Sequence, residues 1–212
     1  MTSAHPTFYQ RRGKRIFDLG AGVAIGIATL PIQVVVAALA SRKLGSPVLF
    51  RQNRPGLNAR PFQLIKFRTM TDAVGPNGVL LPDEKRLTSF GLKLRATSLD
   101  ELPEIYNVIR GEMSLVGPRP LLLQYLDRYS EFEARRHDVR PGLTGLAQVS
   151  GRNAITWEQK FALDVRYTED VNFKLDLQIL LKTVARVISR EGIGQNGQDT
   201  ISEFMGSHTL LR

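Results

Sequence analysis

Two adjacent carboxylates, Asp100 and Glu101, stand out among the residues that could carry chemistry. They lie within Ser98–Pro103, whose sequence is SLDELP. Ser98 and Glu101 fit a capping box, S-x-x-E, and Pro103 suits the first turn of a helix, so Asp100 should lie at or just before a helix N-terminus. The helix dipole there stabilises a carboxylate and also attracts phosphate. Simple helix capping would also explain such a motif if it stood alone.

Basic residues in rigid settings accompany this pair. Pro118 and Pro120 enclose Arg119, a Pro-Gly pair follows Arg140, and a glycine precedes Arg152. Such neighbours fix an arginine without a helical frame, and the arginine fork binds phosphate oxygens in bidentate fashion. Several of these arginines together favour a phosphate-binding site. The candidate residues are Lys66, Arg68, Arg95, Arg119, Arg140 and Arg152.

Composition excludes several other chemistries. The chain has no cysteine, which rules out disulfides, thiolate zinc sites and cysteine nucleophiles, and its three histidines make a histidine-rich metal site improbable. It contains no G-x-x-x-x-G-K-[ST] loop, no H-E-x-x-H and no G-x-S-x-G motif. Carboxylates are the anionic nucleophiles that remain. A carboxylate can attack phosphorus, and Mg²⁺ would help because it binds one or two carboxylates together with substrate phosphates.

The charge balance predicts an anionic partner. The 212 residues carry 29 Lys and Arg against 20 Asp and Glu, a formal charge of +9. Nucleic acid, a lipid surface and phosphate-bearing substrates all satisfy this excess. The length suits one domain, with or without an appendage, and 42% apolar residues are typical of a globular chain.

An uncharged apolar run from Leu19 to Ser41 favours the lipid surface. Its 23 positions exceed the roughly 20 residues that cross a hydrocarbon core. Lys14 and Arg15 precede it, and further basic residues follow it. Because a Lys/Arg excess normally marks the cytoplasmic side, basic flanks at both ends indicate that both ends stay there.

Pro31 lies near the middle of this run. It removes one helical hydrogen bond, so we expect the helix to kink or break there. A helix that enters the membrane, bends at Pro31 and returns would fit, with Thr29 able to satisfy a freed backbone group near the bend. Each arm would reach about 15–18 Å, half of the bilayer. A plain transmembrane anchor and a cleaved signal peptide are the alternatives.

The rest of the chain predicts a mixed α/β fold, mostly helical with a small β-hairpin. The hairpin is expected from 48–51 and 62–67, with a turn at Asn53–Gly56. Helices are expected at 87–94, 102–109, 121–133, 157–167 and 175–190. The last has an apolar stripe, which either covers the core with a solvated far face or lies on anionic lipid. Residues 1–44 would form the basic N-terminus and membrane helix, and 45–212 the catalytic domain.

Several long motifs in order resemble those of the small monotopic phosphoglycosyl transferases of bacteria, the bacterial sugar transferase family. The resemblance runs from Lys14 almost to the C-terminus and is strongest to the PglC type, which acts on UDP-N,N'-diacetylbacillosamine. The motifs are Lys66–Met70 (KFRTM), Ser98–Pro103 (SLDELP), Met113–Pro120 (MSLVGPRP), Arg136–Gly145 (RHDVRPGLTG) and Gly151–Asn153 with Trp157-Glu158.

This resemblance implies a re-entrant helix and a catalytic domain at the cytoplasmic face of the bacterial inner membrane. Asp100 matches the catalytic aspartate, which would take the phosphosugar from a UDP-sugar, release UMP and pass the group to polyprenyl (undecaprenyl) phosphate. The reaction would require Mg²⁺, with Asp100 as its protein ligand, and Glu101 would assist metal or lipid-phosphate activation. Arg95, Arg119 and Arg152 match positions associated with the geometry of the Asp-Glu pair and with phosphate binding.

The implied reaction is the first membrane step of glycoconjugate assembly, with glycosyltransferases downstream. Both substrates are anionic, so nucleic acid is not expected as a partner. One departure concerns the helix bend, where this chain has Leu30-Pro31 instead of the Ser-Pro that is frequent in the family. Two other hypotheses stay open from the residues alone. They are a membrane-anchored module that binds nucleic acid or anionic lipid by charge, and a single-span anchor with an outward domain.

Overall fold

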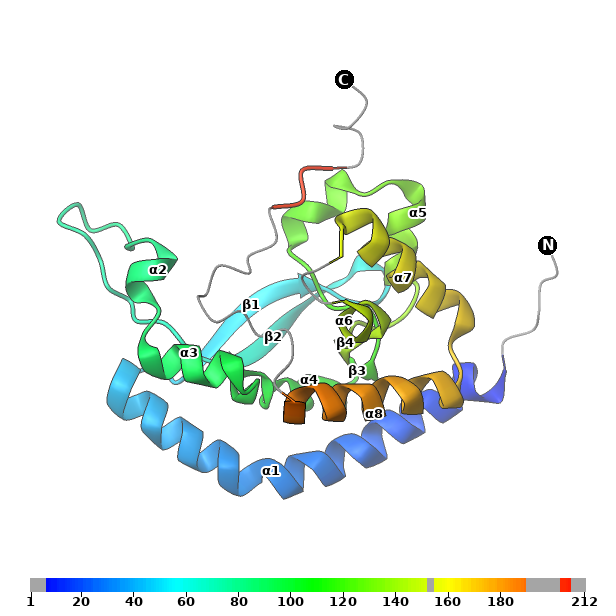
Figure 1. Cartoon of the computed structure of the whole chain (residues 1–212), viewed down its shortest axis with the longest axis horizontal. Coiled ribbons are helices and arrows are strands. Elements are labelled where there is room, and N and C mark those ends of the chain that lie inside the picture. The colour runs from blue at the N-terminus through cyan, green and yellow to red at the C-terminus, as the bar shows by residue number, and fades with distance from the viewer. Residues whose placement is uncertain (1–6, 152–154, 190–202, 207–212) are drawn as a thin grey trace.

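The computed structural model describes residues 7–151, 155–189 and 203–206. A long N-terminal helix runs beneath a body of shorter helices and two small sheets (Figure 1). This arrangement confirms the predicted mixed α/β fold with a membrane-compatible helix at the N-terminus.

The apolar run forms α1 (Lys14–Leu44), a single helix that follows a π-helical turn at Tyr9–Gly13. The helix does not break at Pro31: it continues through this residue and is curved, with its concave side toward the rest of the protein (Figure 1), so of the predicted kink or break only a bend is present. A proline removes only one hydrogen bond, and the turns on both sides can keep the helix together.

Thr29 does not serve the backbone group that Pro31 frees. Pro31 leaves the carbonyl of Ile27 without its usual donor. The Thr29 hydroxyl donates instead to the Ile25 carbonyl at 2.7 Å, and Gln33 Nε2 donates to the same hydroxyl at 3.0 Å. A polar pair thus links the two sides of the proline within an apolar helix.

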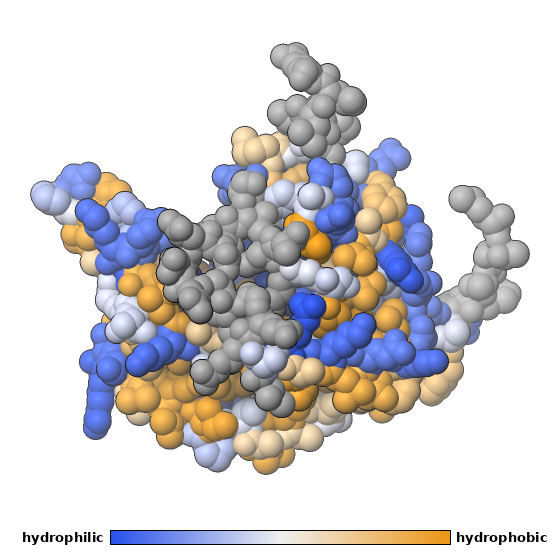
Figure 2. All heavy atoms as spheres, viewed as in Figure 1, coloured by the Kyte–Doolittle hydropathy of each residue, from blue (hydrophilic) through white to orange (hydrophobic). Residues whose placement is uncertain are grey.

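The outer face of α1 is apolar. The helix from Tyr9 to Leu44 is long and apolar enough to cross a membrane, judged by length and composition. Figure 2 shows the hydrophobic surface along this side of the molecule. Because a contiguous apolar patch of this size marks an interaction surface, we read the face as one that contacts lipid. Its large exposed side chains include Ile16, Leu19, Val23, Ile27, Leu30, Ile32, Val34 and Val35.

Lys14 and Arg15 contact protein and are not free basic flanks of the membrane segment. Lys14 Nζ forms an ion pair with buried Asp176 at 2.7 Å. Arg15 donates to the carbonyls of Val108 and Ile109 at 2.6 and 2.7 Å, the end of α4 (Glu104–Arg110). The cations attach the start of α1 to the body, since carbonyls at a helix end attract positive charge.

The predicted hairpin is present, but its turn lies farther along the chain than expected. β1 (Leu49–Pro55) pairs antiparallel with β2 (Pro61–Phe67), and a 3₁₀ turn at Leu57–Ala59 lies between them. Arg54 therefore lies in the strand, opposite Phe62. Burial of Phe62 in the core extends the strand pairing past the residues whose types favoured a turn.

The predicted helices are present except at 121–133, and two short helices at 83–86 and 146–150 were not predicted. The stretch 121–133 divides into a 3₁₀ segment (Leu123–Arg128) and α5 (Glu131–Ala134), because Ser130 is extended and caps α5. A 3₁₀ turn, Arg135–His137, follows. The other helices are α2 (Asp83–Arg86), α3 (Ser89–Ala96), α6 (Leu146–Ser150), α7 (Trp157–Asp170) and α8 (Phe173–Ser189).

A short parallel pair joins the two Pro/Gly-rich motifs. β3 (Ser114–Val116) pairs with β4 (Gly142–Thr144). A Cβ at Gly142 would lie 2.1 Å from the backbone nitrogen of Gly117, so only glycine allows this approach. The strands border the main core, which includes Leu64, Ile105, Val108, Met113, Leu115, Val116, Tyr167 and Ile179.

The far face of α8 carries exposed apolar side chains, unlike the solvated face that one of the two interpretations of this helix expects. Ile179 is buried in the core, while Leu177, Leu181 and Val184 form an exposed stripe; Leu181 is 63% and Val184 57% exposed. In the view of Figure 1, α8 runs above part of α1, and Figure 2 shows hydrophobic surface along α1 and below a band of hydrophilic atoms in the region of α8.

Candidate active site

The Asp-Glu pair lies in a 3₁₀ turn, Leu99–Glu101, immediately before α4. The predicted capping box is absent: Ser98 is in the left-handed region (φ 55°), and its side chain caps no backbone group. Leu99 and Leu102 pack against the small core around Phe67. The apolar neighbours therefore anchor the turn that carries the two carboxylates.

Glu101 is held by two cations. Its Oε1 lies 3.0 Å from Lys66 Nζ on β2, and Arg119 Nη2 donates to the same oxygen. Burial opposes ionisation of Glu101, but the charges of Arg119 and Lys66 outweigh it and hold the pKa of Glu101 well below its usual range. Glu101 is therefore an ionised carboxylate whose Oε1 is already paired with two cations.

Asp100 is in the opposite situation. It is only 8% exposed, and its carboxylate has no hydrogen bond or ion pair with any residue that the structure describes. Burial raises the pKa of Asp100, and the nearby charge of Glu101 raises it further. The positive charges of Lys66, Arg119 and Arg95 lower the pKa of Asp100 and so oppose these two effects. One carboxylate of the pair is thus locked, and the other is free to react or to bind a cation.

A third carboxylate, Glu104, belongs to the same cluster and was not among our candidates. Its Oε1 lies 2.9 Å from Lys66 Nζ, so this lysine bridges Glu101 and Glu104. Burial and the Glu101 charge raise the pKa of Glu104 to about 7. The spacing of three residues would have revealed it, because residues i and i+3 share a helix face.

We expect Glu104→Gln to change how stability depends on pH. Between the ordinary pKa of 4.5 and about 7, the folded protein keeps a proton on Glu104 that the unfolded chain releases. Rising pH therefore favours unfolding, and this penalty is complete above about pH 7. Thermal unfolding in detergent should show Glu104→Gln gaining stability relative to wild type from pH 5 to pH 8. Glu84→Gln, at an exposed site in α2, should follow the wild-type profile, and a Glu104→Gln profile parallel to wild type would contradict the assignment.

The structure brings some of the predicted basic residues to the pair and leaves others elsewhere. Lys66 and Arg119 contact Glu101, and Arg95, whose Nε donates to Thr69 Oγ1 at 3.1 Å, is near enough for its charge to act on Asp100. Arg140 donates to the Gly111 carbonyl at 2.8 Å, away from the pair. Arg152 lies outside the described residues.

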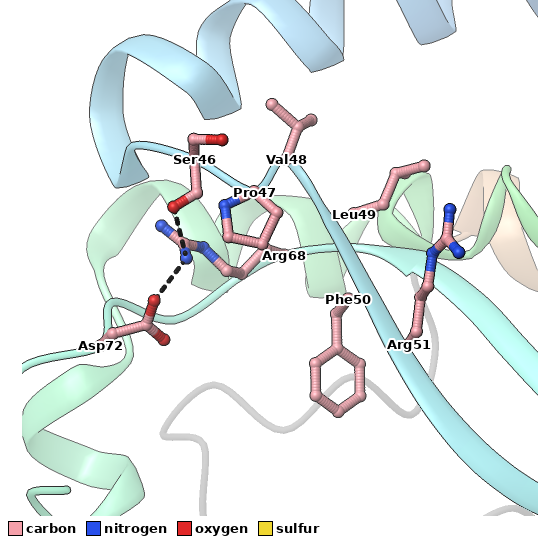
Figure 3. A pocket seen from close by; sticks show the side chains of 8 residues that line it. All are labelled: Ser46, Pro47, Val48, Leu49, Phe50, Arg51, Arg68 and Asp72. Carbon is pink, nitrogen blue, oxygen red and sulfur yellow. Dashed lines mark hydrogen bonds and ion pairs between the residues drawn. The ribbon is translucent and has the colours of Figure 1, made fainter.

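Arg68 has contacts at the end of α1 and does not meet the pair. Its guanidinium donates to the Leu44 carbonyl and to Asp72 Oδ2, the latter at 2.6 Å. It thus caps the C-terminus of α1, where carbonyls lack partners. Figure 3 shows Arg68 with Ser46 and Asp72 in a pocket of about 630 Å³ whose other walls come from residues 47–51. Neither carboxylate of the pair lines this pocket.

A divalent cation fits the donors at Asp100. Within 7–151, 155–189 and 203–206, no group of three or more Asp, Glu or His residues could enclose a metal. Mg²⁺ does not need such a cage, because it binds through one or two carboxylates together with substrate phosphates and water. The buried carboxylate of Asp100, which has no partner within the described residues, fits this mode, whereas Oε1 of Glu101 is already paired with Lys66 and Arg119.

Comparison with known proteins identifies the family. The family model described as bacterial sugar transferase matches residues 9–190, most of the chain. The chain belongs to the bacterial sugar transferase family. The match covers α1, the Asp-Glu pair and α8, so the elements described above are those of the family.

Three relatives of this sugar transferase show how similar the chain is to known members of the family. A Bacillus subtilis protein named uncharacterized sugar transferase EpsL is 53% identical over 92% of this chain and 96% of its own length. A UDP-glucose:undecaprenyl-phosphate glucose-1-phosphate transferase of Caulobacter vibrioides is 39% identical over 84% of this chain and 70% of its own. A UDP-galactose-lipid carrier transferase of Erwinia amylovora is 38% identical over 84% of this chain but only 41% of its own.

These comparisons support a sugar-phosphate transferase that is associated with a membrane. The names of these relatives include undecaprenyl phosphate and a lipid carrier, and the long apolar helix agrees with a membrane-associated protein. The narrower resemblance to the PglC type stays a prediction, since the sugars in these names are glucose and galactose.

Proposed function

We propose that this protein transfers a phosphosugar from a UDP-sugar to undecaprenyl phosphate and releases UMP. The carrying observation is the contrast between the two carboxylates: Asp100 is buried and has no hydrogen bond or ion pair within the described residues, while Glu101 is ion-paired to Lys66 and Arg119. A free carboxylate next to fixed cations has what attack on a phosphate needs. The named activities of the Caulobacter and Erwinia relatives support the same substrate classes.

The proposed reaction has two displacement steps. An Asp100 oxygen attacks the phosphorus that carries the sugar, the bond from this phosphorus to the UMP oxygen breaks, and UMP leaves with the electron pair. An oxygen of undecaprenyl phosphate then attacks the same phosphorus. The bond to Asp100 breaks, which restores the carboxylate and yields undecaprenyl diphosphate sugar. No net redox change or external co-reactant is involved.

Lys66, Arg95 and Arg119 would stabilise the phosphate oxygens during both steps. Glu101 holds Lys66 and Arg119 in place, and the pairing costs no reorganisation when the substrate arrives. Glu101 thus acts in this proposal by positioning cations. The sequence predicted that Glu101 assists metal or lipid-phosphate activation. Because Glu101 already forms ion pairs with Lys66 and Arg119, we propose that it contributes by holding these cations.

Mg²⁺ would be held by Asp100 and the substrate phosphates. When bound, it would neutralise negative charge on the phosphate oxygens that approach the carboxylate. Asp100 supplies the free oxygens, and the buried site limits competing water. Removing Mg²⁺ with a chelator tests this requirement directly.

The identity of the sugar is proposed from the resemblance to the PglC type, and the relatives with named substrates suggest other sugars. An N-acetylated amino sugar such as UDP-N,N'-diacetylbacillosamine is the substrate that the PglC-type motifs favour. The relatives with named substrates act on UDP-glucose and UDP-galactose. The product would be taken up by glycosyltransferases that extend lipid-linked sugars.

A two-part experiment tests the reaction. UMP release is measured with undecaprenyl phosphate and UDP-glucose, UDP-galactose, UDP-N-acetylglucosamine or UDP-N,N'-diacetylbacillosamine. The active donor is then mixed with the enzyme without lipid, and the intact mass is recorded. We expect an added phosphosugar on the protein. Turnover without any such adduct would exclude the covalent route, and no UMP release from any donor would exclude the proposed reaction.

We also propose that α8 lies on the membrane beside α1, at the cytoplasmic face of the bacterial inner membrane. The exposed stripe at Leu177, Leu181 and Val184 supports contact with lipid. The packing of Gly22 on α1 against Val108 on α4 supports an active site near the membrane, because α4 follows the Asp-Glu pair directly.

Leu181→Glu with Val184→Glu should weaken membrane attachment. Two carboxylates in this stripe would oppose its burial in lipid. Because both positions are exposed in the folded protein, the substitutions should not disturb the fold. We expect a larger fraction of the protein to be extracted by high salt from isolated membranes. Gln178→Glu, exposed on the same helix, is the control. Equal extraction of all three proteins would rule out lipid contact by this stripe.

A further inference from the structure

Arg54 lies on the strand face that leads to the active site. In the antiparallel register, Arg54 is opposite Phe62 and Phe50 is opposite Lys66. Side chains two residues apart on a strand share a face, so Arg54 and Lys66 lie on the same face of the hairpin. Lys66 ends at Glu101 and Glu104, and Arg54 is four residues farther along this face on the neighbouring strand.

The Arg54 guanidinium lacks an anionic partner in the described part of the chain. Its Nη2 donates to Gln52 Oε1 at 2.6 Å, a neutral acceptor. Its Nε is buried and has no hydrogen-bond partner among the described residues. Burying an unsatisfied charged donor is costly, and proteins seldom keep such a group without a use for it.

The charged neighbours of Arg54 do not compensate for the missing anionic partner. Burial lowers the pKa of Arg54, and the nearby charge of Arg119 lowers it further; Glu104, Tyr125 and Tyr129 act in the opposite direction. Arg119 already binds Glu101. Two neighbouring guanidinium groups repel each other until an anion lies between them, so this part of the site is prepared for negative charge.

The position of Arg54 also separates it from the nucleophile. The cations that act most strongly on Asp100 are Lys66, Arg119 and Arg95. Arg119 acts on both Asp100 and Arg54. Arg119 therefore lies close enough for its charge to act on both the Asp100 carboxylate and the Arg54 guanidinium.

We propose that Arg54 binds the phosphate of the UDP-sugar that is not transferred and that leaves in UMP. This inference rests on the proposed function and adds a substrate-binding residue to it. The free Nε of Arg54 donates to an oxygen of this phosphate, and Arg119 contacts both phosphates. The lipid phosphate arrives after UMP has left and meets Asp100, Lys66 and Arg95 without needing Arg54.

Arg54→Met tests this assignment through two Michaelis constants. We expect KM for the active UDP-sugar to rise about tenfold to a hundredfold, the loss of one charge-assisted hydrogen bond. KM for undecaprenyl phosphate should stay within about twofold of wild type. The inhibition constant of UMP should rise with the first KM. Arg51→Met is the matched control, because Arg51 is exposed on the opposite face of β1, where it contacts Gln63 at 3.3 Å.

Other outcomes separate the possible failures. An unchanged KM for UDP-sugar, or an equal rise in both constants, would overturn the inference. If Arg54→Met does not fold, Arg54→Lys keeps the charge without the fork and should still weaken UMP inhibition. Calorimetric titration with UDP needs no turnover. If wild type binds UDP but releases no UMP from any donor, the proposed reaction fails, while weaker UDP binding by Arg54→Met would still support the site.

Discussion

Asp100→Asn should abolish turnover, with a loss of at least about a thousandfold, because the variant lacks the attacking carboxylate. Asn is nearly the same size, so the turn Leu99–Glu101 and the ion pairs of Glu101 should persist. Burial already disfavours charge at this position, which means that the neutral side chain should not lower stability. The measurement is UMP release with undecaprenyl phosphate and the active UDP-sugar.

The control for this variant is Asp170→Asn, at an exposed carboxylate on α7 that should leave turnover unchanged. The intact mass provides a second readout. With UDP-sugar alone, the wild-type enzyme should gain a phosphosugar and Asp100→Asn should not. An Asp100→Asn enzyme with wild-type turnover would transfer the role of nucleophile to another residue.

Arg136→Met should cause a large loss of stability, about 3–5 kcal/mol, because it leaves Asp164 as an unpaired buried charge. The two side chains are 1% and 2% exposed, and Arg136 donates to Asp164 Oδ2 from Nε at 3.1 Å and from Nη2 at 2.7 Å. Arg136 Nη2 also donates to the Arg119 carbonyl at 2.7 Å. The variant should therefore also disturb the backbone that presents Arg119 to Glu101.

The neighbouring residue supplies the control. Arg135 forms an exposed ion pair with Glu169, and Arg135→Met should cost no more than about 1 kcal/mol. Denaturant unfolding in detergent compares the proteins. Adding Asp164→Leu to Arg136→Met should restore part of the loss, since the uncompensated charge disappears. Equal free energies of unfolding for Arg135→Met and Arg136→Met would show that the buried pair stabilises the protein no more than the exposed one.

The hairpin and the helix bend show where local rules and packing disagree. Asn53, Pro55 and Gly56 are residue types of turns, but the buried side chain of Phe62 keeps Arg54 in the strand. Pro31 weakens one turn of a helix whose other hydrogen bonds persist, and so bends it instead of ending it. In both cases the local preference was real, but longer-range packing or the rest of the helix outweighed it.

The candidate residues show the same division. Asp100 and Glu101 were readable as a pair because adjacent carboxylates next to a proline have a local signature. Their different states were not readable, since these depend on Lys66, 35 residues earlier, and Arg119, 18 residues later. Arg68 resembled Lys66 in the sequence, yet the fold uses it to cap α1.

Residue types alone established the class of this protein: an uncharged run long enough for a membrane, no cysteine, and motifs shared with a family of sugar transferases. Tertiary structure decided which cations reach the carboxylates, that Lys14 and Arg15 attach α1 to the body, and that Arg54 has no anionic partner in the part of the chain that the structure describes. The physical reason is range. Composition and periodicity act through neighbours along the chain, whereas burial and charge act through neighbours in space, and only the folded chain brings those together.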